Sequence, residues 1–262
     1  AADRLRTLVP GSSHLVHMPS HIDVRTGRFE EASKANERAI AADEKHGPKV
    51  DDASFYQLYM AHNEHMLAFA SMMEGRHDAA LKAARGMVAG VPPAALKSET
   101  GPILDGLMPV VLHVLVRFGR WEEALKEPAF DPTLRSSNAV RHYARGVSLA
   151  ALDRLDEAEV EREALARAIE AMDDRPIGNN PAKLVLQVPL KVLEGELLFR
   201  RGQRDEGLAT LREAVRLEDT LLYDEPPDWM QPARHTLAAT LLAADRPQEA
   251  EQAAREDLAR FP

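Results

Sequence analysis

Six short segments of the chain share one pattern, and this pattern is the strongest constraint on the fold. Each begins with Gly or Asp, carries one or two acidic residues, ends on a small residue and continues with helical periodicity. The segments are GRFEEA at 27–32, GRHDAA at 75–80, GRWEEA at 119–124, DRLDEA at 153–158, GQRDEG at 202–207 and DRPQEA at 245–250. The left-handed backbone conformation that ends a helix costs the least conformational energy at Gly, and acidic residues are favoured where the next helix begins. The pattern therefore predicts six helix pairs that turn at the Gly or Asp and pack closely at the small residue.

The spacing of these segments indicates a repeat architecture. Their final small residues lie 34 to 49 residues apart, and a period of this length that holds two helices is typical of a solenoid. Aromatic residues are only 5% of the chain and charged residues 29%, which suits helices packed through Ala and Leu rather than a β-sandwich. We expect an all-α fold, a right-handed superhelix of about six helix pairs that covers residues 1–262 as one domain without a sheet.

The segments resemble the tetratricopeptide repeat. That family's pattern has a turn Gly, an aromatic residue two positions on, two later Ala residues and a closing Pro. The matching residues are Gly27, Phe29, Ala32 and Ala39 in the first unit, Gly119, Trp121 and Ala124 in the third, and Ala250 and Pro262 in the last. The spacing extends the resemblance over the whole chain. It implies a concave groove for a peptide, a protein or a small molecule, but no particular activity, because the fold serves many partners.

A narrower resemblance rests on HMPSHI, HNEHM and YDEPPDW, which look like segments of bacterial tetratricopeptide proteins of unassigned role. No activity carries over from that group. The first ten residues, AADRLRTLVP, are typical of the end of a second helix, and the last unit stops at Pro262 without a capping helix. We therefore expect a fragment that lacks flanking repeats at both ends. A cytoplasmic location is expected, with a signal peptide ahead of residue 1 left open.

Composition and motifs exclude several functions. The net charge of −9 argues against nucleic acid as a partner. No apolar run approaches 18 residues, so no membrane span is expected. The absence of cysteine excludes thiolate metal sites and thiol catalysis. Phosphate-binding glycine motifs and the nucleophile elbow are absent, and HNEH at 62–65 differs from the zincin motif in its spacing.

Histidines cluster on one stripe of the predicted first helices. Seven of the ten lie 6, 10 or 13 residues before a turn residue. They are His14, His17 and His21 before Gly27, His62 and His65 before Gly75, His113 before Gly119 and His235 before Asp245. Positions three and four apart share a helix face. By the resemblance, this face lines the concave groove.

The histidines of the first two units predict a transition-metal site. Neighbouring helices pack about 9–10 Å apart, which lets imidazoles from both converge. So many imidazoles cannot all be charged, and neutral imidazole binds Zn, Cu, Fe or Ni. The predicted ligands are His14, His17, His21, His62 and His65, with Asp23, Glu64, His113, Arg117, Tyr143 and His235 in the groove or around the ligands. Metal-assisted catalysis on a small molecule or peptide is an extension of this hypothesis. The alternative is that the histidines are buried and hydrogen-bonded, above all His113 and His235.

Several features leave alternatives open. Pro19 should kink the helix between His17 and His21, either to aim the histidines or only to adjust the curvature. Arginines two residues before the turn glycines, at positions 25, 117 and 200, either complement a helix C-terminus or form an anion-binding row. Linkers rich in Pro and Gly are expected at about 89–102, 173–181 and 223–232. Trp229 in the last linker either plugs the fold or contacts a ligand.

Three classes of function remain open. The first is a metal-binding protein with its site among the N-terminal histidines. The second is a peptide or protein interaction scaffold that uses the groove without a metal. The third is a structural role in an assembly, and the sequence leaves open whether the protein is an enzyme.

Overall fold

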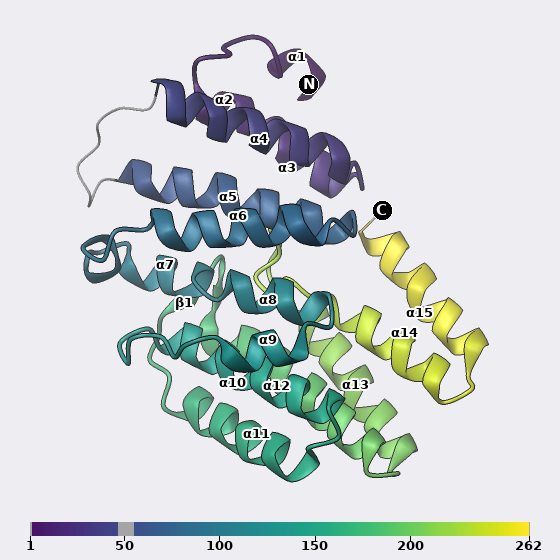
Figure 1. Ribbon diagram of the computed structural model, residues 1–262. Coiled ribbons are helices and arrows are strands. Elements are labelled where there is room, and N and C mark those ends of the chain that lie inside the picture. Colours follow the sequence, from purple (N-terminus) through teal and green to yellow (C-terminus); the bar gives the residue numbers. More distant parts are fainter. Residues whose placement is uncertain (1, 47–54, 262) are drawn as a thin grey trace. The chain divides into compact units, whose positions relative to one another are not determined.

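The computed structural model describes residues 2–46 and 55–261, and this part of the chain is almost wholly helical (Figure 1). The expected all-α class is confirmed. The expected absence of any sheet is wrong in one place, because strands β1 (Pro176–Ile177) and β2 (Asn180–Pro181) pair antiparallel. Gly178, with a φ of 52°, lies in the tight turn between the two strands. The hairpin falls within the predicted linker 173–181, where prolines disfavour a helix.

The six predicted turns are confirmed, and all have the same structure. Their Gly or Asp residues have φ between 59° and 87°. In each turn the N–H of this residue donates to the carbonyl three residues before it, and the next N–H donates to the carbonyl five residues before it. At Gly27 these are the bonds to Val24, at 3.2 Å, and from Arg28 to Asp23, at 2.8 Å. The pair of bonds is the Schellman motif, which satisfies carbonyls left unpaired at a helix end.

Each turn joins two helices. The pairs are α3 (Pro19–Arg25) with α4 (Phe29–His46), α5 (Phe55–Met73) with α6 (His77–Gly90), α8 (Val110–Arg117) with α9 (Trp121–Lys126), α10 (Arg135–Ala151) with α11 (Leu155–Glu170), α12 (Ala182–Arg200) with α13 (Arg204–Asp219), and α14 (Ala233–Ala243) with α15 (Pro247–Arg260). The other helical elements are α1 (Ala2–Leu5), α2 (Ser13–His17), the 3-10 helix η1 (Ala95–Lys97) and α7 (Gly101–Leu107). No helix in the described ranges is long and apolar enough to cross a membrane.

The expected kink at Pro19 is instead a break between two helices, and Pro109 lies at a second break. Helix α2 ends at His17 and α3 begins at Pro19. Helix α7 likewise ends two residues before Pro109, whereas Pro189 lies inside the continuous helix α12. A proline ring has no N–H to donate, so it is tolerated best where a helix begins. The N–H of Met18 still donates to the carbonyl of His14, at 3.0 Å, so the chain bends rather than separates there.

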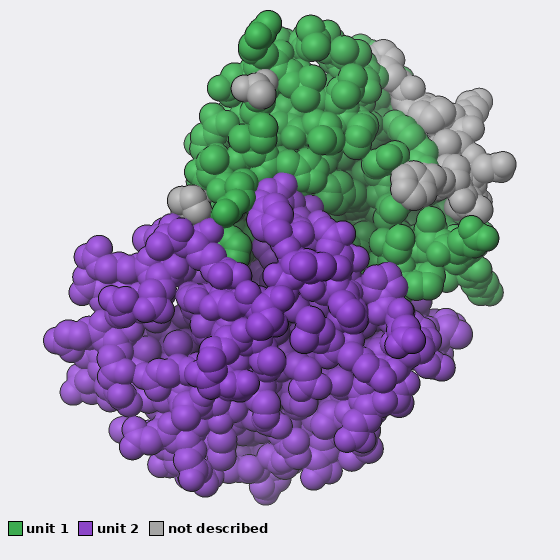
Figure 2. Space-filling view, turned by 180° about the vertical axis from the view of Figure 1, so that it is seen from behind, with its two compact units in different colours: residues 1–114, 261–262 green, residues 115–260 purple. Residues whose placement is uncertain are grey.

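The chain forms two compact units, residues 1–114 with 261–262 and residues 115–260, coloured separately in Figure 2. In the first unit, α4 packs against α2, α3 and α5, and α5 packs against α6. In the second unit, α10 packs against α11 and α12, and α13 packs against α12 and α14. The small residues predicted at helix contacts are buried in both units; they include Ala32, Ala80, Ala124, Ala158 and Ala250. Met66 and Met72 of α5, the helix that carries His62 and His65, are also core residues.

Helices α12 and α13 approach each other closely at two glycines. A Cβ atom on Gly207 would lie 2.7 Å from the carbonyl oxygen of Gly195 and 2.8 Å from the backbone nitrogen of Phe199. Both neighbours are backbone atoms, so relief would require the helices to move apart. Gly207 is the small residue of the fifth segment, and this helix pair leaves no room for the methyl group that Ala brings in the other five segments.

We expect Gly207→Ala to lower the free energy of unfolding by about 1–3 kcal/mol, because the added methyl overpacks this contact. The measurement is urea denaturation followed by far-UV circular dichroism. Gly90→Ala in α6 is the matched control, since its Cβ would meet nothing within 4 Å. That change should be neutral or should stabilise by up to about 1 kcal/mol. Equal unfolding midpoints for the two variants would contradict the interpretation.

Candidate metal centre

Three histidines bring ring nitrogens together in the first unit. His17 is the last residue of α2, His21 lies in α3 and His62 lies in α5. One ring nitrogen of each lies within 4.8 Å of the others, and the Nε2 atoms of His17 and His21 are 2.9 Å apart. The ring centroid of His62 is 4.8 Å from that of His17 and 5.4 Å from that of His21. Nitrogens around a tetrahedral zinc ion are about 3.3 Å apart for bonds of 2.0–2.1 Å, so modest ring movements would form such a site.

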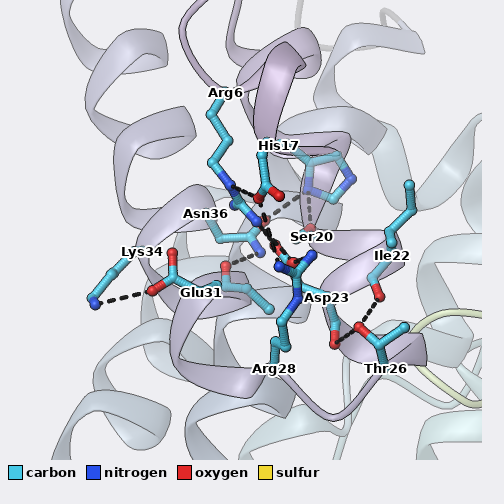
Figure 3. A network of polar contacts seen from close by, with 12 residues as sticks. Arg6, His17, Ser20, Ile22, Asp23, Thr26, Arg28, Glu31, Lys34 and Asn36 are labelled. Carbon is cyan, nitrogen blue, oxygen red and sulfur yellow. Dashed lines mark hydrogen bonds and ion pairs between the residues drawn. The ribbon is translucent and has the colours of Figure 1, made fainter. Parts of the chain in front are cut away.

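Asn36 in α4 fixes the orientation of the His17 ring. Its Nδ2 atom donates to the carbonyl of Ala32, at 2.9 Å, and its Oδ1 atom lies 2.7 Å from Nδ1 of His17 (Figure 3). Because the amide nitrogen is committed to Ala32, the atom that faces the ring is an acceptor. Nδ1 of His17 therefore carries the hydrogen and Nε2 presents its lone pair to the other histidines. Metal-ligating histidines are commonly held by such a bond from the second ring nitrogen.

The cluster favours neutral imidazoles. Burial lowers the pKa of His17 to about 4, the bond to Asn36 opposes the shift, and the charges of His21 and His14 add to it. Burial also lowers the pKa of His62 well below its usual value, with further lowering by neighbouring histidines. For His14 the pKa falls through burial and the charge of His21. The lone pairs of His17 and His62 are thus not blocked by an added proton near pH 7. Since Nε2 of His17 is the acceptor, Nε2 of His21 donates to it, and a metal ion bound there would take the place of this hydrogen.

The other two predicted ligands lie outside this group of three. His14 stacks beside Tyr59, with ring centroids 4.5 Å apart, and its ring lies 6.2 Å from that of His17. His65 is buried, and burial lowers its pKa to about 4. Its charge acts on His113, which is also buried and whose pKa falls to about 3. His14 therefore borders the cluster, while His65 and His113 interact with each other in the core.

The two predicted carboxylates are engaged elsewhere. Asp23 is fully buried and accepts hydrogen bonds from Arg6, at 2.7 and 2.8 Å, and forms an ion pair with Arg28, at 2.6 Å (Figure 3). It links the segment that follows α1 to the first turn instead of supporting a histidine. Glu64 lies against Gly86 of α6 and lines a separate cavity of about 220 Å³. Burial and the charge of Glu44 raise the pKa of Glu64 to about 7.

The remaining predicted residues lie in the second unit. Nη1 of Arg117 donates to Nδ1 of His235, at 2.9 Å. Nε2 of His235 therefore carries the hydrogen and donates to Asp257, at 3.0 Å. Tyr143 is buried beneath Trp229, which is 2% exposed and meets the tyrosine ring edge-on at 4.9 Å between centroids. Of the two interpretations of Trp229, the plug is the one that the structure shows.

Comparisons with protein-family models, with curated proteins and with solved structures found no match to this chain. The candidate site therefore rests on its own geometry. Within residues 2–46 and 55–261, His17, His21 and His62 form the one group of three or more side chains placed to hold a metal ion. Sequence reasoning found all three histidines and missed Asn36, whose only signal was a polar residue four positions after the buried Ala32 in α4.

The buried pair His65 and His113 predicts a loss of stability in acid. The unfolded chain takes up these protons near pH 6.5, whereas the folded protein takes them up only near pH 4 and pH 3. The contribution of this pair to stability is thus fully present above pH 6.5 and is lost as the pH drops toward 4, by about 1.4 kcal/mol per pH unit for each group. Urea denaturation of metal-free protein at pH 7.5, 6 and 5 measures this slope. His113→Gln should remove one proton from the pH dependence, so the free energy of unfolding should change less steeply with pH. An unchanged slope would contradict the assignment.

Proposed function

We propose that the first unit binds a divalent transition metal ion through His17, His21 and His62. The observation that carries the proposal is the convergence of their ring nitrogens from three helices. The neutral state of His17 and its orientation by Asn36 support it. Imidazole ligands suit Zn, Cu, Fe and Ni.

The ligand set favours an ion that keeps a coordination position for another molecule. Three neutral imidazoles leave the double positive charge of the ion uncompensated, because the nearby carboxylates Asp23 and Glu64 face other groups. His21 and His62 are only half-buried, so solvent reaches the site. A three-histidine ion with an open position binds water or an anion and lowers the pKa of bound water. This is the chemistry through which the site would act on a small molecule or peptide.

We further propose that the helix pairs form a tetratricopeptide-like solenoid. Three observations support it. The six Schellman turns have the same structure, a small residue is buried after each turn, and these small residues lie 34 to 49 residues apart. In this arrangement α2 and α3 precede the second helix α4, and α5 precedes the second helix α6. These first helices carry the metal ligands, while α4 supplies Asn36. The scaffold role without metal is the competing function, and metal analysis separates the two.

The expected result of a metal titration is one equivalent bound at micromolar or lower concentration. The protein is purified, stripped with a chelator and titrated calorimetrically at pH 7.5 with Zn²⁺, and in parallel with Ni²⁺ and Cu²⁺. His21→Ala and His62→Ala should each greatly weaken binding, because two imidazoles remain.

The matched control is His142→Ala in α10, since this histidine lies in the second unit and pairs with Glu161. It should bind like the unaltered protein, and helical content should be unchanged in all variants. The proposal fails if the stripped protein takes up none of the three ions, or if all three variants bind them equally.

Replacing Asn36 tests the orientation of His17 separately from the ligands. Asn36→Ala should weaken zinc binding about 10- to 100-fold, because the ring loses the acceptor that fixes its tautomer. Asn36→Asp should retain binding, since a carboxylate accepts the same hydrogen. Calorimetry on both variants, with thermal unfolding as a check of the fold, makes the comparison. Equal affinities for Asn36→Ala and the unaltered protein would show that the contact is only structural.

A further inference from the structure

The second unit contains a cavity of about 620 Å³ that the metal proposal does not involve. Its lining comes from α9, α10, α12, α13 and α14, together with the end of α8. Buried Tyr143 and Val147 contribute apolar surface, and Trp121 and Phe199 add aromatic rings. Pockets of about 300–1,000 Å³ with apolar walls and a few convergent polar groups are typical of small-molecule sites.

Three guanidinium groups line this cavity. Arg117 donates to His235, Arg204 lies over the ring of Phe199 at 5.7 Å, and Arg200 interacts electrostatically with Glu196. Among the described residues none of the three forms an ion pair with a carboxylate. Other arginines of this unit do, for example Arg212 with Glu249, at 2.7 Å. Since the chain has 42 acidic and 33 basic residues, a cavity with three guanidinium groups outside any ion pair departs from the general charge balance.

The acidic groups near the cavity offset this charge only partly. Burial raises the pKa of Glu196 to about 7, against the opposing charge of Arg200. Asp257 acts on Arg117 but is already engaged by Nε2 of His235. The chain Arg117–His235–Asp257 holds the first guanidinium in place, so that it is oriented before any ligand arrives.

We propose that this cavity binds a small organic carboxylate. Arg117, Arg200 and Arg204 offer the planar donor groups that pair with a carboxylate. Trp121, Tyr143 and Phe199 supply the apolar surface for an aromatic or aliphatic body. Inorganic phosphate would use the charge and leave the rings without a partner, whereas a neutral ligand would leave the guanidinium groups uncompensated. The site lies wholly in the second unit and its proposal is independent of the metal site.

The test uses 3-phenylpropionate and its neutral counterpart 3-phenylpropanamide as probes, with inorganic phosphate as a third ligand. Calorimetry on the full chain at pH 7.5 should show saturable binding of the carboxylate. The amide and phosphate should each bind at least about tenfold more weakly, and added salt should weaken carboxylate binding. Arg200→Gln and Arg204→Gln should each reduce affinity about tenfold or more, the usual effect of losing one charge-assisted hydrogen bond.

Two control variants separate the site from its surroundings. Arg212→Gln removes an arginine of α13 that pairs with Glu249 and does not line the cavity, so carboxylate affinity should not change. Arg216→Gln, which removes an arginine of α13 that pairs with Glu213 and does not line the cavity, should also leave it unchanged. The proposal is overturned if the carboxylate fails to bind at 10 mM, if the amide or phosphate binds as tightly, or if Arg212→Gln lowers affinity as much as Arg200→Gln.

Discussion

The left-handed turn residue between paired helices is the constraint on which the rest of the structure depends. It allows the chain to reverse within three residues while the last carbonyls of the first helix remain hydrogen-bonded. Four of the six positions are Gly, and Asp153 and Asp245 occupy the same conformation at φ of 60° and 59°. Asp tolerates this region better than most side chains. The short reversal then forces the second helix against the first, which is why a small residue is buried soon after each turn.

The same turn makes part of the candidate site readable from sequence. Counting back from Gly27 and Gly75 placed His17, His21 and His62 on related helix faces, and the structure brings these three together. His65 has the same offset from its turn as His17 but lies in the core beside His113. The break at Pro19 explains the difference. His17 and His21 lie on two separate short helices, α2 and α3, whereas His62 and His65 lie on the single continuous helix α5. The distance in sequence from the turn residue thus predicts which helix face a histidine occupies. How deeply its side chain is buried depends on whether the helix is continuous or broken.

Long-range pairing accounts for most of what the sequence could not predict. Asp23 lies two positions from His21, yet its partners are Arg6, from a segment read only as a helix end, and Arg28 beyond the turn. Asn36 acts on His17 across nineteen residues of chain. Neither contact follows any helical spacing. The sequence left open whether the arginines before the turns complement a helix C-terminus or form an anion-binding row. Arg117 and Arg200 line one cavity, whereas Arg25 belongs to the other unit.

The distribution of acids explains how an acidic chain leaves few carboxylates at the two candidate sites. The residue after a turn repeatedly bonds the acid three positions on, as Arg120 does with Glu123 and Arg154 with Glu157. Such acids stabilise the start of the second helix through its dipole and remain on exposed surface. They are therefore held away from the first helices, which carry the histidines of one unit and two of the three cavity arginines of the other. The repeated pattern that defines the helix pairs thus also assigns most of the negative charge to second helices and leaves first helices to carry imidazole and guanidinium groups.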